Sequence, residues 1–116
     1  MNEFEKIKQN LPKTEILRKR KEINEVFEKG HIWNGKYLKC LYIKSNHRKV
    51  GFIVSKRHGN AVRRNHAKRM MREIYRKNRQ AADIMKILIL PKDNMSSGNL
   101  KELETDFIRF CQCIKS

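Results

Sequence analysis

The chain has 116 residues, of which 39% are hydrophobic and 34% are charged, and its formal net charge is +16. This length suits one small domain with a modest core, and no apolar run approaches the roughly 20 residues that cross a bilayer, which argues against a membrane-spanning protein. Such an excess of positive charge points to a polyanionic partner, with nucleic acid ahead of an anionic membrane surface.

The N-terminal part begins with a polar segment. Residues 1–14 are mostly polar and charged, and we expect them to form a flexible basic arm, which leaves residues 15–116 as a single domain. A short helix is predicted from about Arg20 to Lys29, because its apolar residues recur at helical spacing and Gly30 follows as a stop. These apolar residues are Ile23, Val26 and Phe27.

Two strands are predicted next, from Tyr37 to Lys44 and from Val50 to Lys56, because both segments are rich in strand-forming residues. Their connection is short and has turn chemistry, which favours an antiparallel hairpin. A third strand is predicted from Ile84 to Leu90. Its nearly continuous apolar run is typical of a strand buried on both faces, as parallel pairing across a helix would produce.

A last helix is predicted from about Asn99 to Ile114, where Asn99 and Glu102 have the spacing of a capping box. With the basic helix described next, the order is helix, strand, strand, helix, strand, helix. This order indicates an α+β sandwich in which helices cover one sheet.

The stretch from Lys56 to Arg79 contains ten Lys and Arg residues and a single acid, Glu73. After a turn at His58-Gly59-Asn60, a helix is predicted from about Ala61 to Lys77. At about 100° per residue, one sector about 140° wide is polar and cationic, and the opposite side is apolar. The cationic sector contains Arg64, Asn65, Lys68, Arg69, Arg72, Arg76 and Arg79, and the apolar side contains Val62, Ala67, Met70, Met71 and Ile74.

Two interpretations fit a cationic sector of this kind. Most charged runs on helices are ordinary solvated surfaces. Here, however, cations repeat every fourth residue with almost no acids between them, and such pairs repel by a few tenths of a kcal/mol each. This arrangement favours a site for a phosphate backbone.

The sequence offers no obvious catalytic or metal centre of its own. The three cysteines, Cys40, Cys111 and Cys113, are odd in number, and the Cys-Gln-Cys pair lacks a zinc spacing. Free thiols indicate a reducing compartment, so we expect a cytoplasmic protein. No paired carboxylates and no Ser-His-Asp grouping stand out, and a hydrolytic centre carried by the protein is therefore not expected.

Several motifs together resemble the protein subunit of bacterial ribonuclease P. They are LRKRKE at 17–22, VF at 26–27 with Gly30, VGFIVSKR at 50–57, GNAV-x-RN at 59–65, KR at 68–69 and RE at 72–73. The match extends over roughly Leu17 to Leu90. The run from 59 to 73 is long, ordered and specific.

This resemblance implies a fold with a left-handed strand–helix–strand crossover, although right-handed crossovers dominate in general. It also implies that the protein binds ribonuclease P RNA and the 5′ leader of precursor tRNA, and so supports endonucleolytic 5′ maturation. The catalytic centre and its Mg²⁺ ions would be held mainly by the RNA subunit.

The resemblance also assigns residues. Those expected to contact the catalytic RNA are Lys56, Arg57, Asn60, Arg64, Asn65, Lys68, Arg69 and Arg72. Those expected to line a leader-binding cleft are Ile23, Phe27, Lys39, Leu41 and Ile53.

The sequence departs from the family pattern at three positions. His66 replaces the usual Arg and falls on the apolar side of the helix, so we expect it to be half-buried. Ile23 and Leu41 stand where the family often has aromatic residues. Base stacking contributes about 1–3 kcal/mol per base, so these two positions shift the expected leader contact towards Phe27, Lys39 and backbone charge.

Two other functions fit parts of the pattern. A generic structural RNA-binding protein, such as a ribosomal component, would have the same composition. A peripheral membrane protein would need bulky apolar residues on its basic helix, and the helix has no Trp, Phe or Leu there.

Overall fold

A four-stranded sheet runs through the computed structural model, which describes residues 13–114. Its spatial order is β1-β2-β4-β3. Strands β1, β2 and β4 pair antiparallel, and β3 pairs parallel with β4. The bounds are β1 His31–Asn34, β2 Leu38–Lys44, β3 Lys49–Phe52 and β4 Met85–Pro91.

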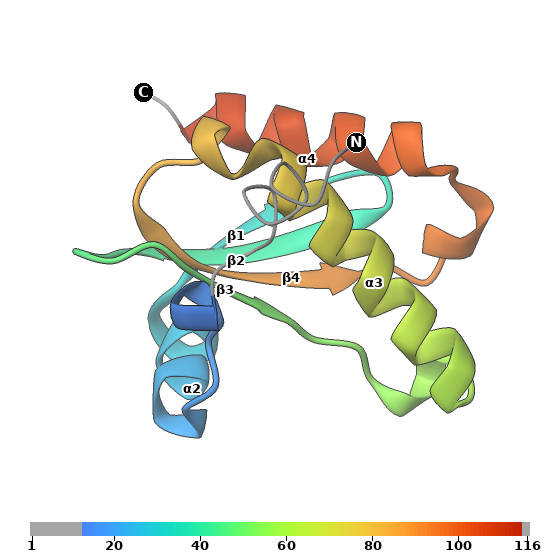
Figure 1. Cartoon of the computed structure of the whole chain (residues 1–116), viewed down its shortest axis with the longest axis horizontal. Helices are drawn as coiled ribbons and strands as arrows, with labels where there is room; N and C mark the ends of the chain where they lie inside the picture. The colour runs from blue at the N-terminus through green and yellow to red at the C-terminus, as the bar shows by residue number, and fades with distance from the viewer. Residues whose placement is uncertain (1–12, 115–116) are drawn as a thin grey trace, which may run out of the picture.

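Helices cover both faces of this sheet. Helices α3 and α4 lie on one face and α2 lies on the other (Figure 1). Helix α2 spans Arg20–Lys29, α3 spans Ala61–Asn78 and α4 spans Leu100–Ile114. Short 3₁₀ turns complete the structure: η1 Lys13–Glu15, η2 Lys56–His58, η3 Arg79–Ala81 and η4 Met95–Ser97.

The expected flexible arm falls mostly outside the described part of the chain, because residues 1–12 are not among those described. Lys13 and Thr14 belong to η1. The chain then joins the sheet, since the N–H of Leu17 donates to the carbonyl of Val50 at 2.8 Å.

Strand β4 is the centre of the sheet. Its apolar run is buried along most of its length, as the sequence predicts, and it pairs with β2 on one side and β3 on the other. The predicted hairpin between Tyr37–Lys44 and Val50–Lys56 is therefore wrong. The most apolar strand takes the position between them, where both of its faces are covered. The parallel β3–α3–β4 unit is confirmed, and it is the crossover that the resemblance implies to be left-handed.

Strand β1 was not predicted, so the order is corrected to helix, three strands, helix, strand, helix. It has four residues, and three of them are exposed, which gives no clear alternation. Its pairing is nevertheless well supported, because the Trp33 ring packs edge-on against Phe110 with centroids 5.6 Å apart.

The helix ends follow the sequence closely. The bounds of α2 match the prediction. The capping box of α4 is confirmed: Asn99 Oδ1 accepts from the N–H of Glu102 at 2.9 Å, and Glu102 Oε1 accepts from the N–H of Asn99 at 3.2 Å. The second predicted strand ends at Phe52 instead of Lys56, because the chain turns into η2.

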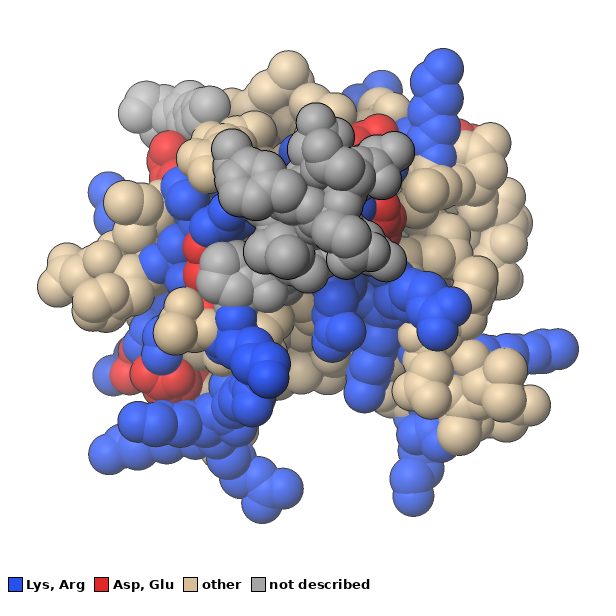
Figure 2. Space-filling model, in the orientation of Figure 1, with Lys and Arg blue, Asp and Glu red and all other residues tan. Residues whose placement is uncertain are grey.

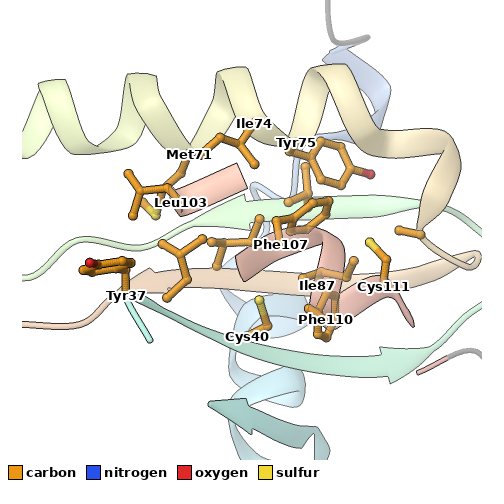
Figure 3. Close-up of a cluster of buried hydrophobic side chains, with 14 of the residues drawn as sticks. Tyr37, Cys40, Met71, Ile74, Tyr75, Ile87, Leu103, Phe107, Phe110 and Cys111 are labelled. Atoms are coloured by element: carbon orange, nitrogen blue, oxygen red, sulfur yellow. The ribbon is translucent and has the colours of Figure 1, made fainter. Parts of the chain in front are cut away.

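The main core lies between the sheet and helices α3 and α4 (Figure 3). Its largest side chains include Tyr75, Phe107 and Phe110, which contact one another edge-on or tilted. Burial raises the pKa of the Cys40 thiol in this core well above its usual value. A smaller core lies under α2 and consists of Leu17, Val26, Leu41 and Leu88.

Candidate nucleic-acid interface

A group of cations on α3, which we call the cationic strip, consists of Arg64, Lys68, Arg69 and Arg72. Helix α3 rests on the core through Met71, Ile74 and Tyr75, so the strip occupies the flank next to these buried residues. Lys68, Arg69 and Arg72 are exposed and Arg64 is half-buried.

The positive charges of the cationic strip are not neutralised by the protein's own acids in the part of the chain that the structure describes. Among residues 13–114, no acidic side chain forms an ion pair with any of its four members. The guanidinium of Arg72 instead lies over the Phe52 ring, 5.8 Å from its centroid. Figure 2 shows Lys and Arg side chains projecting over much of this side of the molecule. The strip is therefore a set of oriented positive charges open to a partner.

Two members of the predicted cationic sector behave differently. Arg76 pairs with Glu73, with 2.5 Å between Nη2 and Oε1, and Arg79 pairs with Glu15 of the N-terminal segment. The hydrogen bond from Arg76 lowers the pKa of Glu73, and the hydrogen bond to Glu15 raises the pKa of Arg79. The charge of Arg76 is thus neutralised within α3, and Arg79, in the turn that follows α3, links this end of the helix to the N-terminal segment.

The apolar side of α3 was predicted only in part. Met71 and Ile74 are buried as expected, but Val62 is 77% exposed. His66 is also exposed, so the prediction of a half-buried histidine is wrong. The reason is that the buried residues lie in the second half of α3, while its first half extends past them.

The turn before α3 brings further polar groups to the helix start. Gly59 has a φ of 114°, a conformation that favours glycine, and Asn60 Oδ1 accepts from the N–H of Arg63 at 3.0 Å. Asn60 thus positions the helix. Lys56 and Arg57 are exposed beside it, although Arg57 pairs with Asp93 at 3.3 Å. Asn65 is also exposed.

A second candidate surface lies on the α2 side of the sheet. Strand register places Lys39 opposite Leu90, and Ile53 continues β3, where its N–H donates to the carbonyl of Ile89 at 3.0 Å. We call this region the α2 surface. It consists of Ile23, Phe27, Lys39, Ile53 and Leu90.

The α2 surface is mixed in exposure. Phe27 is 47% exposed, while Ile23, Ile53 and Leu90 are half-buried against the smaller core. Leu41 is only 4% exposed, because α2 covers it, so its expected contact with a leader does not fit the structure. Leu90 was missed, although alternation along the third predicted strand places it on the same face as Leu88.

Two other findings concern the described residues only. No group of three or more His, Cys, Asp or Glu side chains in residues 13–114 could hold a metal ion. In the same part of the chain, no helix combines the length and apolar character needed to cross a membrane.

A family comparison identifies the class of protein that carries this interface. The model of the Ribonuclease P family matches residues 11–115 of the chain. The chain belongs to the ribonuclease P protein family. It is therefore an RNA-binding component of a ribonucleoprotein endoribonuclease that acts in tRNA processing.

Individual ribonuclease P proteins agree with this assignment. The component from Finegoldia magna is 34% identical over 104 residues, which cover 88% of this chain and 92% of that protein. The component from Geobacter sp. (strain M21) is 37% identical over 101 residues, which cover 84% of this chain and 85% of that one.

A solved structure of the ribonuclease P protein from Thermotoga maritima has the same fold, with a TM-score of 0.78 at 24% identity. The superposition covers 88% of this chain and 99% of that one.

Proposed function

We propose that the protein binds the catalytic RNA of ribonuclease P through the cationic strip and holds the 5′ leader of precursor tRNA on the α2 surface. The observation that carries this proposal is a contrast between cations along α3 and the η3 turn that follows it. Arg76 and Arg79 are paired with the protein's own acids, whereas the four members of the strip are not.

The strip suits an RNA backbone for electrostatic reasons. Its cations stand on one rigid helix at spacings of three and four residues, so their mutual repulsion is relieved when phosphates lie against them. The η2 turn before this helix adds Lys56, and the helix start adds the positive end of the helix dipole, which also attracts phosphate.

The α2 surface suits a single-stranded leader. Phe27 offers an exposed ring on which a base can stack, and Lys39 supplies a cation beside apolar contacts from Ile23, Ile53 and Leu90. This mixture binds unpaired nucleotides with little dependence on sequence. A leader of variable sequence needs such a site.

The Mg²⁺ ions that support cleavage belong to the RNA in this proposal. The described residues do not fit a Mg²⁺ site of their own, because no group of three or more His, Cys, Asp or Glu side chains among them could hold a metal ion. The protein's contribution is to neutralise phosphates and to position the leader. We also infer that it acts in the cytoplasm.

Reconstitution at low Mg²⁺ tests this function. The full chain is mixed with ribonuclease P RNA and precursor tRNA, and 5′ processing is measured with and without the protein. We expect the protein to restore cleavage at Mg²⁺ concentrations where the RNA alone is slow. Binding to the RNA without any stimulation would instead indicate a generic structural RNA-binding protein.

A further inference from the structure

The Phe52 ring contacts two neighbouring side chains of α3. Phe52 is the last residue of β3 and is half-buried against the main core. The guanidinium of Arg72 lies over this ring, 5.8 Å from its centroid, and the Tyr75 ring meets it at an angle of 75° with centroids 6.2 Å apart. Arg72 and Tyr75 are three residues apart and are therefore neighbours on the helix surface. One ring of the sheet thus touches both an exposed cation and a buried aromatic residue.

The core fixes the position of the Phe52 ring. Tyr75 is fully buried, and its own ring packs against Phe107 of α4 with centroids 5.9 Å apart (Figure 3). The backbone of Phe52 is held as well, because this residue pairs with Ile89 of the central strand β4. A row of three rings therefore connects the interior of the protein to Arg72.

Arg72 depends on this ring for its place on the flank of α3. Lys68 and Arg69 stand four and three residues before it, and like charges at these spacings repel. No acid among residues 13–114 forms an ion pair with Arg72 that would balance this repulsion. The electron-rich face of Phe52 attracts the guanidinium instead. Of the four members of the cationic strip, only Arg72 lies over an aromatic ring of the described residues.

We infer that Phe52 is a positioning residue for the RNA contact of Arg72. The inference rests on the proposed function, in which Arg72 meets a phosphate. A guanidinium that rests on a ring keeps the N–H groups at its edge available to phosphate oxygens, so one side chain can make both contacts at once. The ring also restricts the rotamers of a long, exposed arginine before RNA arrives, which improves affinity without adding a contact to the RNA.

Fluorination of the Phe52 ring tests this role, because fluorine withdraws electrons from the ring face with little change in the size of the ring. Mono-, di- and trifluorinated phenylalanine are incorporated at position 52 of the full chain, and the dissociation constant for ribonuclease P RNA is measured for each. We expect this constant to rise with each added fluorine, by about two- to fivefold over the series, as the loss of an exposed cation–π contact predicts. The slope of log affinity against log salt should not change, because the number of phosphate contacts stays the same.

Two matched comparisons separate positioning from packing. Phe107 contacts the same Tyr75 ring, but no cation lies over it among the described residues. The same fluorinated residues at position 107 should therefore leave RNA affinity unchanged. In an Arg72→Ala background the dependence on fluorine at position 52 should disappear, whereas in an Arg69→Ala background it should persist.

Three results would overturn the inference. They are a dissociation constant that does not depend on fluorine at position 52, a dependence that remains in Arg72→Ala, and an equal dependence at position 107. If any of them occurred while Arg72→Ala still weakened RNA binding, the proposed function would stand without this role for Phe52. Wild-type RNA binding by Arg72→Ala would contradict the proposed contact of Arg72 itself, and the inference would fail with it.

Discussion

Asp106 Oδ2 accepts a hydrogen bond from the backbone N–H of Tyr37, with 2.6 Å between the two atoms. The same carboxylate accepts from the N–H groups of Lys36 and Leu38 at 3.1 and 3.0 Å. Asp106 is 3% exposed, so no bulk water replaces these contacts. One side chain of α4 thereby fixes the turn between β1 and β2.

Replacement of Asp106 should destabilise the fold. In Asp106→Asn, an NH₂ group replaces one of the two carboxylate oxygens that accept from the three backbone N–H groups. We expect the free energy of unfolding to fall by about 2–4 kcal/mol. Urea denaturation measures it. Asp83→Asn removes an exposed acid and should change stability by less than about 0.5 kcal/mol. Equal effects of the two changes would contradict this role of Asp106.

The cationic strip should contribute to RNA affinity through phosphate contacts. Arg69→Ala should weaken binding of ribonuclease P RNA and reduce the slope of log affinity against log salt by about 0.7–0.9, the value for one lost phosphate contact. Arg109→Ala removes the same charge at an exposed position of α4 and should leave both quantities nearly unchanged. Arg64→Ala should behave as Arg69→Ala does, and wild-type binding by both strip variants would show that the strip is not the RNA site.

The α2 surface should distinguish substrates with and without a leader. Phe27→Ala should weaken holoenzyme binding of leader-bearing precursor tRNA by about 1–3 kcal/mol, because one stacked base loses its platform. Binding of leaderless tRNA should not change. Ile84→Ala removes another exposed apolar side chain, 54% accessible, and serves as the control. If the loss were the same for both RNAs, Phe27 would not be a leader contact.

The capping box should make stability depend on pH. Hydrogen bonds from the N–H of Asn99 and the hydroxyl of Tyr37 hold the pKa of Glu102 below its ordinary 4.5. The pKa of Glu102 is lower in the folded protein than in the unfolded chain. The stability that ionised Glu102 contributes is therefore complete above pH 4.5, and it is lost as the pH falls through the folded-state pKa.

The melting temperature of Glu102→Gln should accordingly lie below that of the wild type at pH 7, and the difference should shrink at pH 3. Glu28→Gln, which changes an exposed acid on α2, controls for the general effect of charge. A difference between wild type and Glu102→Gln that stays constant across this range would argue against an ionised cap.

Local signals in the sequence were sufficient for much of this fold. Helix α2, the capping box at Asn99 and the apolar run of β4 depend on spacing within a few residues, and all three were predicted. The parallel pairing of β3 with β4 across α3 was also predicted, but the hairpin of β2 with β3 was wrong, because both strands, although close in sequence, pair with β4. Pairing of this kind depends on competition between distant segments.

In the candidate site, too, local sequence patterns were predictable and contacts between distant segments were not. Helical periodicity placed Arg64 and Arg72 on one flank, but it could not show that the buried residues of α3 all lie in its second half. Val62 and His66 were consequently assigned to the wrong environment. The alternation of side chains along the first predicted strand likewise identified the sheet face on which Leu41 lies. It could not reveal that α2 covers Leu41.

The central position of β4 has a consequence for the biosynthesis of the protein. Among the strands, Met85–Pro91 is made last, yet it separates β2 from β3 and hydrogen-bonds to both. Until this segment leaves the ribosome, β3 has no neighbouring strand and α3 has no completed platform beneath it. A nascent chain that stalls before Met85 therefore lacks the strand that joins β2 to β3, and the sheet is completed late in translation.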